Sequence, residues 1–338
     1  MIIHTKLFVL LLVVLSIGLP SCQEEELPAL STSPVTNITT NTACCGGNIT
    51  SDGRGHITEK GVCWNTTGNP TTNDNKTSDG QGVGSYISNL TGLLPCTNYY
   101  LKAFAINEVG TAYGNEIIFT TTSNNSSTNY NPNLTYGTVS DIEGNVYKTI
   151  QIGTQIWMAE NMRATRRQDG TPINLVTDNT MWGAWDQDPG YTTSPKYCWF
   201  NNDEATYRCL YGALYNFPAA EVCPTGWHVP SYGEWNTLIN YLGGKNLAGG
   251  RMKEIGFIHW NNPNSGATNE SGFTALPGGG RASNGIFSNT GSGGSWWTSN
   301  SDGLYEACAV FLSYETNYIH VDWMYYKTNG RSVRCLKD

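Results

Sequence analysis

The chain has 338 residues, which is enough for two domains of ordinary size. With 38 glycines, 19 tyrosines, 11 tryptophans and only 14% charged residues, its composition is typical of an exported protein built mainly from strands and turns. The net charge of −8, without a basic stripe that could neutralise phosphates, argues against a nucleic-acid partner.

The first residues predict export and membrane anchoring. A lysine precedes an apolar run over residues 7–14, which is too short to span a bilayer, and Leu-Pro-Ser at 19–21 leads into Cys22. This stretch resembles the signal peptide and lipobox of bacterial lipoproteins. The resemblance implies removal of residues 1–21 and acylation of Cys22, which would hold the protein on a membrane. Ordinary secretion with cleavage nearby is the alternative.

Residues 23–26, Gln-Glu-Glu-Glu, follow the predicted anchor. They resemble the acidic export tag of lipoproteins of the Bacteroidetes type. That resemblance implies the outer membrane, with the protein facing the cell exterior. We interpret residues 22–34 as a lipidated acidic tether, although an acidic segment could also serve only to keep the tether solvated.

Residues 35–122 predict a small β-sandwich. They are dense in Thr, Val, Ile and Gly, and turn signals recur at close intervals. Alternate residues of one strand share a face, namely Tyr99, Leu101, Ala103 and Ala105. The run Leu-x-Pro-x-Thr-x-Tyr at 93–99 resembles the tyrosine corner of fibronectin type III domains, in which the phenol hydroxyl bonds to upstream backbone. Trp64 would supply the core aromatic of an early strand.

Residues 123–136 are almost devoid of apolar side chains that a fold could bury. We therefore predict a flexible linker there.

The segment from residue 137 onward predicts a second domain. Strand-like residues 146–150 and 155–158 surround Gly153, which favours a hairpin. A helix should begin at Ser231, because Glu234 follows three residues later as in a capping box. Apolar residues then recur at helical spacing before the stop at Gly243-Gly244, namely Trp235, Leu238, Ile239 and Leu242.

Residues 137–338 resemble the Fibrobacter succinogenes major paralogous domain. The matching runs are Gly153–Asn161, Tyr211–Asn216, Cys223–Ser231, Gly272–Gly279 and Ser332–Cys335. This family is similar to C-type-lectin-like folds, with compact antiparallel sheets and long loops at one end. The expected fold class is therefore mainly β with two domains, a fibronectin type III-like β-sandwich followed by an α+β C-type-lectin-like domain.

The ten cysteines of an exported chain indicate structural disulfides. If Cys22 is acylated, nine remain, so at least one thiol stays free or pairs between molecules. The resemblance implies a bridge between Cys223 and Cys335. Pairing among Cys198, Cys209 and Cys308 stays open. The sandwich cysteines depart from the usual fibronectin type III pattern and suggest one or two added bridges: Cys44, Cys45, Cys63 and Cys96.

A catalytic constellation is weakly supported. His228 lies near Cys223, which suggests a Cys/His pair for nucleophilic chemistry. The implied bridge removes Cys223 from that role, so we expect His228 to be a hydrogen-bonded packing residue. Cys308 with Cys335 could mimic the reactive pair of formylglycine-generating relatives, but the motifs around that pair are absent. We expect no catalytic residues.

We also expect no metal or cofactor. The Glu-Pro-Asn, Gln-Pro-Asp and Trp-Asn-Asp motifs of calcium-dependent lectins are absent. Oxygen ligands cluster at Asn201, Asn202, Asp203 and Glu204, where calcium could bind without a supporting motif. Such a run is more often a solvated turn.

Aromatic and amide-rich residues crowd into the last fifty positions. Rigid aromatics mixed with Asn, Ser and Asp are typical of binding surfaces and also suit sugars, which stack on rings and bond through hydroxyls. The candidate ligand-binding residues are Trp297, Asn300, Asp302, Tyr305, Tyr314, Asn317, Tyr318, His320, Asp322, Trp323, Tyr325 and Tyr326. Burial of Trp296 or Trp297 in the core is the alternative for that pair.

The sequence thus favours a surface lipoprotein whose sandwich is a spacer and whose C-terminal domain binds an extracellular glycan or protein without turnover. A structural or assembly component that docks onto an outer-membrane partner is the second hypothesis. An enzyme of the lectin-like branch is the third.

Overall fold

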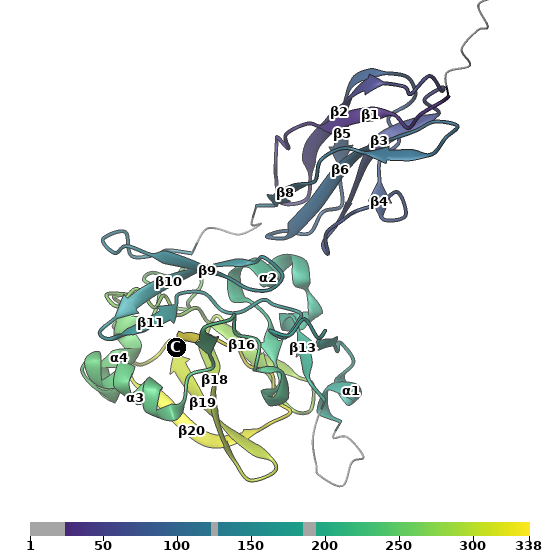
Figure 1. Cartoon of the computed structure of the whole chain (residues 1–338). Helices are drawn as coiled ribbons and strands as arrows, with labels where there is room; N and C mark the ends of the chain where they lie inside the picture. Colours follow the sequence, from purple (N-terminus) through teal and green to yellow (C-terminus); the bar gives the residue numbers. More distant parts are fainter. Residues whose placement is uncertain (1–23, 123–127, 185–193) are drawn as a thin grey trace, which may run out of the picture.

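The computed structural model describes residues 24–122, 128–184 and 194–338 (Figure 1). It contains an N-terminal β-sandwich and a larger C-terminal domain of strands, short helices and loops. The predicted signal peptide and the predicted acylation site Cys22 lie outside the described residues. Within the described ranges, the helices are too short or too polar to cross a membrane.

Two sheets form the sandwich. The first has the order β1-β2-β5 and consists of β1 (Ala29–Thr32), β2 (Ala43–Ser51) and β5 (Gly84–Leu90). The second has the order β4-β3-β6-β7 and consists of β3 (Glu59–Asn65), β4 (Asn75–Lys76), β6 (Asn98–Ile106), β7 (Thr111–Tyr113) and β8 (Ile117–Thr120), which also pairs with β6. This arrangement is the fibronectin type III-like sandwich that the sequence predicts.

The predicted alternation along β6 is confirmed. Tyr99, Leu101, Ala103 and Ala105 are all buried. Trp64 of β3 packs into the same core. The tyrosine corner is also confirmed, because the backbone N–H of Leu94 donates to the Tyr99 hydroxyl at 2.8 Å.

The predicted tether 22–34 is wrong over its second half. Ala29–Thr32 is strand β1, which pairs antiparallel with β2. Thr32 is buried, and its hydroxyl accepts a hydrogen bond from the N–H of Ala103 at 3.0 Å. The segment Ala-Leu-Ser-Thr is too short to show an apolar alternation, so pairing with β2 rather than local pattern makes it a strand.

The C-terminal domain has three sheets. The first has the order β15-β21-β11-β10-β9, with β9 (Gly137–Ser140), β10 (Val146–Ile152), β11 (Gln155–Met158), β15 (Trp227–His228) and β21 (Leu336–Lys337). The second has the order β12-β13-β14, with β12 (Asn174–Leu175), β13 (Lys196–Cys198) and β14 (Leu214–Tyr215). The third has the order β17-β16-β18-β19-β20, with β16 (Gly278–Arg281), β17 (Phe287–Thr290), β18 (Gly293–Asp302), β19 (Glu306–Ser313) and β20 (Ile319–Tyr326).

Short helices connect these sheets. They are α1 (Asn179–Gly183), α2 (Glu204–Tyr211), α3 (Tyr232–Tyr241) and α4 (Lys245–Met252), with 3-10 turns η1 (Phe200–Asn202) and η2 (Phe217–Ala219). The predicted helix is confirmed as α3, and Ser231 and Glu234 form the capping box. The predicted hairpin is confirmed as β10 and β11.

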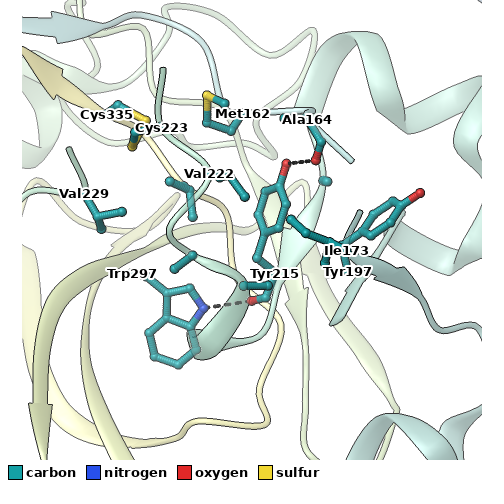
Figure 2. Close-up of a cluster of buried hydrophobic side chains, with 14 of the residues drawn as sticks. Met162, Ala164, Ile173, Tyr197, Tyr215, Val222, Cys223, Val229, Trp297 and Cys335 are labelled. Atoms are coloured by element: carbon teal, nitrogen blue, oxygen red, sulfur yellow. Dashed lines mark hydrogen bonds between the residues drawn. A yellow bond between two sulfur atoms is a disulfide. The ribbon is translucent and has the colours of Figure 1, made fainter. Parts of the chain in front are cut away.

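Two aromatic-rich clusters form the core of this domain. In one, shown in Figure 2, the indole N–H of Trp297 donates to the carbonyl of Tyr215 at 2.8 Å, and the Cys223–Cys335 disulfide belongs to the same cluster. In the other, the rings of Trp157, Trp235 and Trp296 pack around Phe273. Both Trp296 and Trp297 are fully buried, as the core alternative for that pair requires.

The interpretation of residues 123–136 as a flexible linker is wrong for its second part. Tyr130, Leu134 and Tyr136 pack against the C-terminal core. The Tyr130 hydroxyl donates to Glu160 Oε1 at 2.9 Å, and the N–H of Asn129 donates to Glu254 Oε1 at 2.6 Å. The polar majority of the segment hid these three apolar side chains, which are enough to anchor it.

The disulfides differ in part from the prediction. The Cys223–Cys335 bridge is confirmed. Cys96 of the sandwich pairs with Cys209 of α2, so this second bridge joins the two domains. The expectation of one or two added bridges from the sandwich cysteines is thus met by Cys96 alone, because Cys44, Cys45 and Cys63 are free.

Candidate functional site

The strand register of the third sheet separates a buried face from an open one. Val310 of β19 lies opposite Val321 of β20, and both belong to the face that packs on the core around Trp296. Phe311 lies opposite His320, so these two rings share the other face. That second face is covered by β14 and η2 near Trp297 and is open toward the β19–β20 turn.

A groove of about 240 Å³ lies on this open face. Its side-chain walls are Phe311, Tyr325, Ser288, Asn289, Asn329 and Arg331, and its backbone walls include Gly279, Gly280 and Gly330. Glycine backbone leaves peptide groups accessible, so the groove offers two aromatic faces among amide, hydroxyl and peptide groups. This is the mixture of apolar surface and few polar groups that small-molecule sites share.

Arg331 holds one of the two rings in place. Its guanidinium carbon lies 3.5 Å from the centroid of the Tyr325 ring and 5.5 Å from that of Trp297. Its Nη1 donates to the Ser295 hydroxyl at 2.8 Å. The cation–π contact and the hydrogen bond fix the orientation of Tyr325 before any ligand arrives.

An aromatic row continues from the groove toward the β19–β20 turn. The ring centroids of Phe311 and His320 lie 6.2 Å apart, and those of His320 and Tyr318 lie 4.7 Å apart. All three side chains are half-buried, so each keeps part of its surface open to solvent. We call this groove, with His320 and Tyr318 as its extension, the aromatic groove.

The second arginine of the groove is structural. Arg281 is 1% exposed, and its guanidinium donates to the carbonyls of Val176, Thr177 and Gly285. It also stacks on the ring of Trp182 at 4.5 Å. Because those contacts occupy the guanidinium, Arg281 forms the back wall and leaves Arg331 as the cation nearest the ring of Tyr325.

The predicted ligand residues divide between this groove and other places. Tyr325 lines it, and Tyr318 and His320 extend it. Trp297 is wrong as a ligand residue, because its indole is fully buried under β14 and η2. Tyr326 is 52% exposed, but it alternates with Tyr325 and points away from the groove.

The remaining candidates lie at the two ends of the sheet. Asn300 accepts a hydrogen bond from the N–H of Tyr232 at 2.6 Å, which ties β18 to α3. Asp302 and Tyr305 lie exposed at the β18–β19 turn. Tyr314 packs against the core at the other end, where Asn317 contacts α4. The side chains of two further candidates lie outside the description: Asp322 and Trp323.

The sequence did not indicate five residues of the groove's side-chain walls: Ser288, Asn289, Phe311, Asn329 and Arg331. They come from β17, from β19 and from the segment after β20, and the pairing of β16 with β17 and β18 brings these segments together. The run Gly278-Gly279-Gly280-Arg281 was a usable signal, because consecutive glycines permit a close backbone approach.

The part of the chain that carries the groove matches a known protein family. Residues 150–337 match the profile of the Fibrobacter succinogenes major domain. The chain belongs to this family. Every residue of the aromatic groove lies within the matched range, which we call the major domain. A comparison with curated proteins finds no match.

Several solved structures are similar to part of this chain. They include the sensor domain of the anti-sigma factor RsgI4 of Pseudobacteroides cellulosolvens, at 17% identity over 28% of this chain and 94% of that one, with a TM-score of 0.23. A fibronectin type III domain of human collagen XX is 22% identical over 29% of this chain and 95% of that one, with the same TM-score. These values carry no conclusion about binding.

His228 of the major domain is a bonded residue, as predicted. Its Nδ1 lies 2.6 Å from Asp338 Oδ1, and its Nε2 lies 2.9 Å from Glu234 Oε1. Burial alone would lower the pKa of His228, but the bonds to the two carboxylates outweigh it and raise the pKa above its usual value. Cys335 is bonded to Cys223, so the alternative of a reactive Cys308–Cys335 pair is wrong.

The oxygen-rich run at 201–204 has structural partners. Asp203 caps α2 by accepting from the N–H of Thr206 at 3.1 Å, and Glu204 pairs with Arg208 at 2.8 Å. Asn202 donates to the carbonyl of Thr177. Among the residues that the structure describes, no group of three or more His, Cys, Asp or Glu side chains could hold a metal ion.

Proposed function

We propose that this protein is an exported surface protein whose major domain binds a glycan through the aromatic groove, without turnover. The observation that carries the proposal is the ring of Tyr325, held by Arg331 and flanked by Asn289 and Asn329. Sugar rings present C–H faces that stack on such aromatics and hydroxyls that bond to amides. The groove is smaller than sites for drug-sized ligands, so it suits a single sugar ring of a longer chain.

The location of the protein is part of the proposal. The lipobox-like run before Cys22 and the acidic residues after it support a lipid anchor in the outer membrane that faces the cell exterior. The sandwich would then act as a spacer between the anchor and the major domain. Labelling intact cells with an antibody against the major domain, before and after a Cys22→Ala change, tests both points.

The binding test uses the full chain on an array of bacterial, plant and host polysaccharides, with calcium and with chelator. We expect saturable binding to at least one glycan and at least a tenfold loss of affinity for Tyr325→Ala. Tyr326→Ala is the matched control, because it removes the neighbouring ring that points away from the groove. Binding that survives Tyr325→Ala, or a folded protein that binds no glycan, would refute the proposal.

A second candidate function is docking onto an outer-membrane partner protein. The loop after α4 exposes three apolar side chains close together in sequence, Ile255, Phe257 and Ile258, at 39%, 63% and 60%. Exposed apolar clusters often mark protein contacts. Co-purification of one membrane protein with the wild type, lost in Phe257→Ser and kept in Tyr325→Ala, would favour this function over glycan binding.

A further inference from the structure

The two domains meet in a close and covalent contact. The disulfide between Cys96 and Cys209 joins the segment just before β6 to α2, which faces the base of the sandwich in Figure 1. Beside it, Asn98 Nδ2 donates to the carbonyl of Gly144. A Cβ atom on Gly144 would lie 2.8 Å from that nitrogen, so the approach depends on glycine at this position.

A cavity of about 420 Å³ opens beside this contact. The sandwich contributes Thr66, Asn98 and Tyr100 to its wall, and the major-domain side contributes Glu143, Arg166 and Arg208. Neither domain alone would enclose it. Its volume lies within the range that binds small molecules, unlike that of the aromatic groove.

The charged groups of the cavity balance one another. Glu204 accepts from Arg208 Nη1 at 2.8 Å. Glu143 accepts from the Thr165 hydroxyl at 2.6 Å, and Arg166 donates to the carbonyl of Gly170 at 3.1 Å. Two carboxylates and two guanidinium groups therefore line the space, so neither an anionic nor a cationic ligand gains from net charge. A neutral ligand that both donates and accepts hydrogen bonds fits best.

The donors that a ligand can reach are those of Arg166. Arg166 is half-buried, and the bond from its Nη1 to the Gly170 carbonyl uses one of its five N–H groups. Arg208 is 8% exposed, and its Nη2 reaches Asn145 Oδ1 at 3.4 Å. Its Nε has less than 1 Å² of accessible surface, so Arg208 forms part of the wall without offering that N–H to the cavity.

We propose that this cavity is a second binding site, separate from the aromatic groove, that takes a small neutral sugar. A hydroxyl oxygen would accept from the guanidinium of Arg166, and other hydroxyls would bond to Glu143 and Asn98. The half-buried ring of Tyr100 would contact one face of the sugar. Because its walls come from both domains, the site exists only while the Cys96–Cys209 bridge is closed.

The test measures binding of the full, oxidised chain to glucose, galactose, mannose and xylose by calorimetry and ligand-observed NMR. Glucuronate and glucosamine serve as anionic and cationic analogues of glucose. We expect at least one neutral sugar to bind, its charged analogues to bind at least tenfold more weakly, and Tyr100→Ala to lose at least tenfold. Tyr113→Ala is the control, because it changes an exposed tyrosine of the same sandwich outside the cavity.

The double change Cys96→Ser with Cys209→Ser tests the dependence on the bridge. We expect the same loss of affinity as for Tyr100→Ala, with both domains still folded by circular dichroism. The proposal is overturned if no neutral sugar binds, if Tyr100→Ala or the double serine variant binds as well as the wild type, or if only Tyr325→Ala abolishes binding. The last outcome would assign the sugar to the aromatic groove.

Discussion

The sandwich and the major domain satisfy their backbone polar groups in different ways. In the sandwich, the ladders of two sheets pair them along the strands, and buried Lys60 donates to a single loop carbonyl, that of Gly82, at 3.1 Å. In the major domain, long loops carry carbonyls that no strand can pair, and buried cations donate to them. Arg334 donates to Asn161 Oδ1 at 2.7 Å, to the Thr274 carbonyl at 3.0 Å and to the Phe273 carbonyl.

Lys253 plays the same part at a second place. Its ammonium donates to the carbonyls of Ser265, Ser313 and Thr316 at 2.9, 3.0 and 3.0 Å. Burial lowers the pKa of Lys253 to about 8, which shows the cost of keeping a cation there. A loop-rich fold thus depends on a few buried side-chain donors for carbonyls that strand ladders do not pair. Single changes at these donors should therefore affect the major domain more than changes in the sandwich affect the sandwich.

The largest expected effect is that of the bridge within the major domain. Replacing Cys223 and Cys335 by serine opens a loop of sequence separation 112, which should cost about 5 kcal/mol in the chain-entropy model. The Cys96–Cys209 bridge has almost the same separation, 113, but it joins two folded units that the chain already tethers. Its removal should change neither domain's unfolding transition by more than ~1 kcal/mol, as calorimetry can measure. Equal losses of unfolding free energy on removal of either bridge would contradict this difference between the two bridges.

Arg334→Met should be the next most severe change. It leaves the Phe273 and Thr274 carbonyls without their buried donor, whereas Asn161 Oδ1 keeps the indole N–H of Trp296 at 2.8 Å. We expect a loss of roughly 3 to 5 kcal/mol in the major domain. Lys76→Met in the sandwich is the control, because its ion pair with Glu59 is exposed and should contribute below ~1 kcal/mol. Urea unfolding followed by tryptophan fluorescence measures the unfolding free energy of both variants. Similar losses in the two variants would contradict the proposed difference between the two domains.

Tyr99→Phe should have a smaller effect, confined to the sandwich. It removes the hydroxyl that accepts from the Leu94 N–H, and we expect a loss of about 1 to 2 kcal/mol. The Tyr113 hydroxyl also accepts from a backbone N–H, that of Thr72 at 3.1 Å, but this bond is exposed and water can replace it. Tyr113→Phe should therefore change the same transition by less than ~0.5 kcal/mol. Hydrogen exchange at Leu94 provides a local readout, and unchanged protection there would contradict the role of the corner.

The smallest effect concerns pH and the His228 contact. The folded-state pKa of His228 is raised, so its stabilisation is fully present below the unfolded value of about 6.5 and is lost as pH rises through the folded value. As pH rises from about 6.5 through the folded-state pKa of His228, the urea midpoint of major-domain unfolding should fall in the wild type. In His228→Gln it should fall less. Because His228 is partly exposed, the difference should stay below ~1 kcal/mol. The same pH dependence in both proteins would exclude His228 as its source.

Local patterns in the sequence determined the elements whose partners lie a few residues away. The capping box and apolar spacing placed α3, period-two alternation placed β6, and the run at 93–99 placed the tyrosine corner. The resemblance to the major domain implied the Cys223–Cys335 bridge. The three predictions from local patterns held because they depend on hydrogen bonds and side-chain faces within one turn or one strand, whereas the bridge joins residues 112 apart and came from the resemblance.

Tertiary structure alone decided the features that join distant segments. Ala29–Thr32 forms strand β1 because it pairs antiparallel with β2. Cys96 bonds to Cys209 because the sandwich contacts the C-terminal domain at α2. The sequence predicted Tyr325 as a ligand residue but could not show that the Arg331 guanidinium would pack on its ring. It also could not show that Trp297, which is equally aromatic, would be buried. Composition shows which side chains can stack on a ligand, but packing against other elements determines which of them stay accessible.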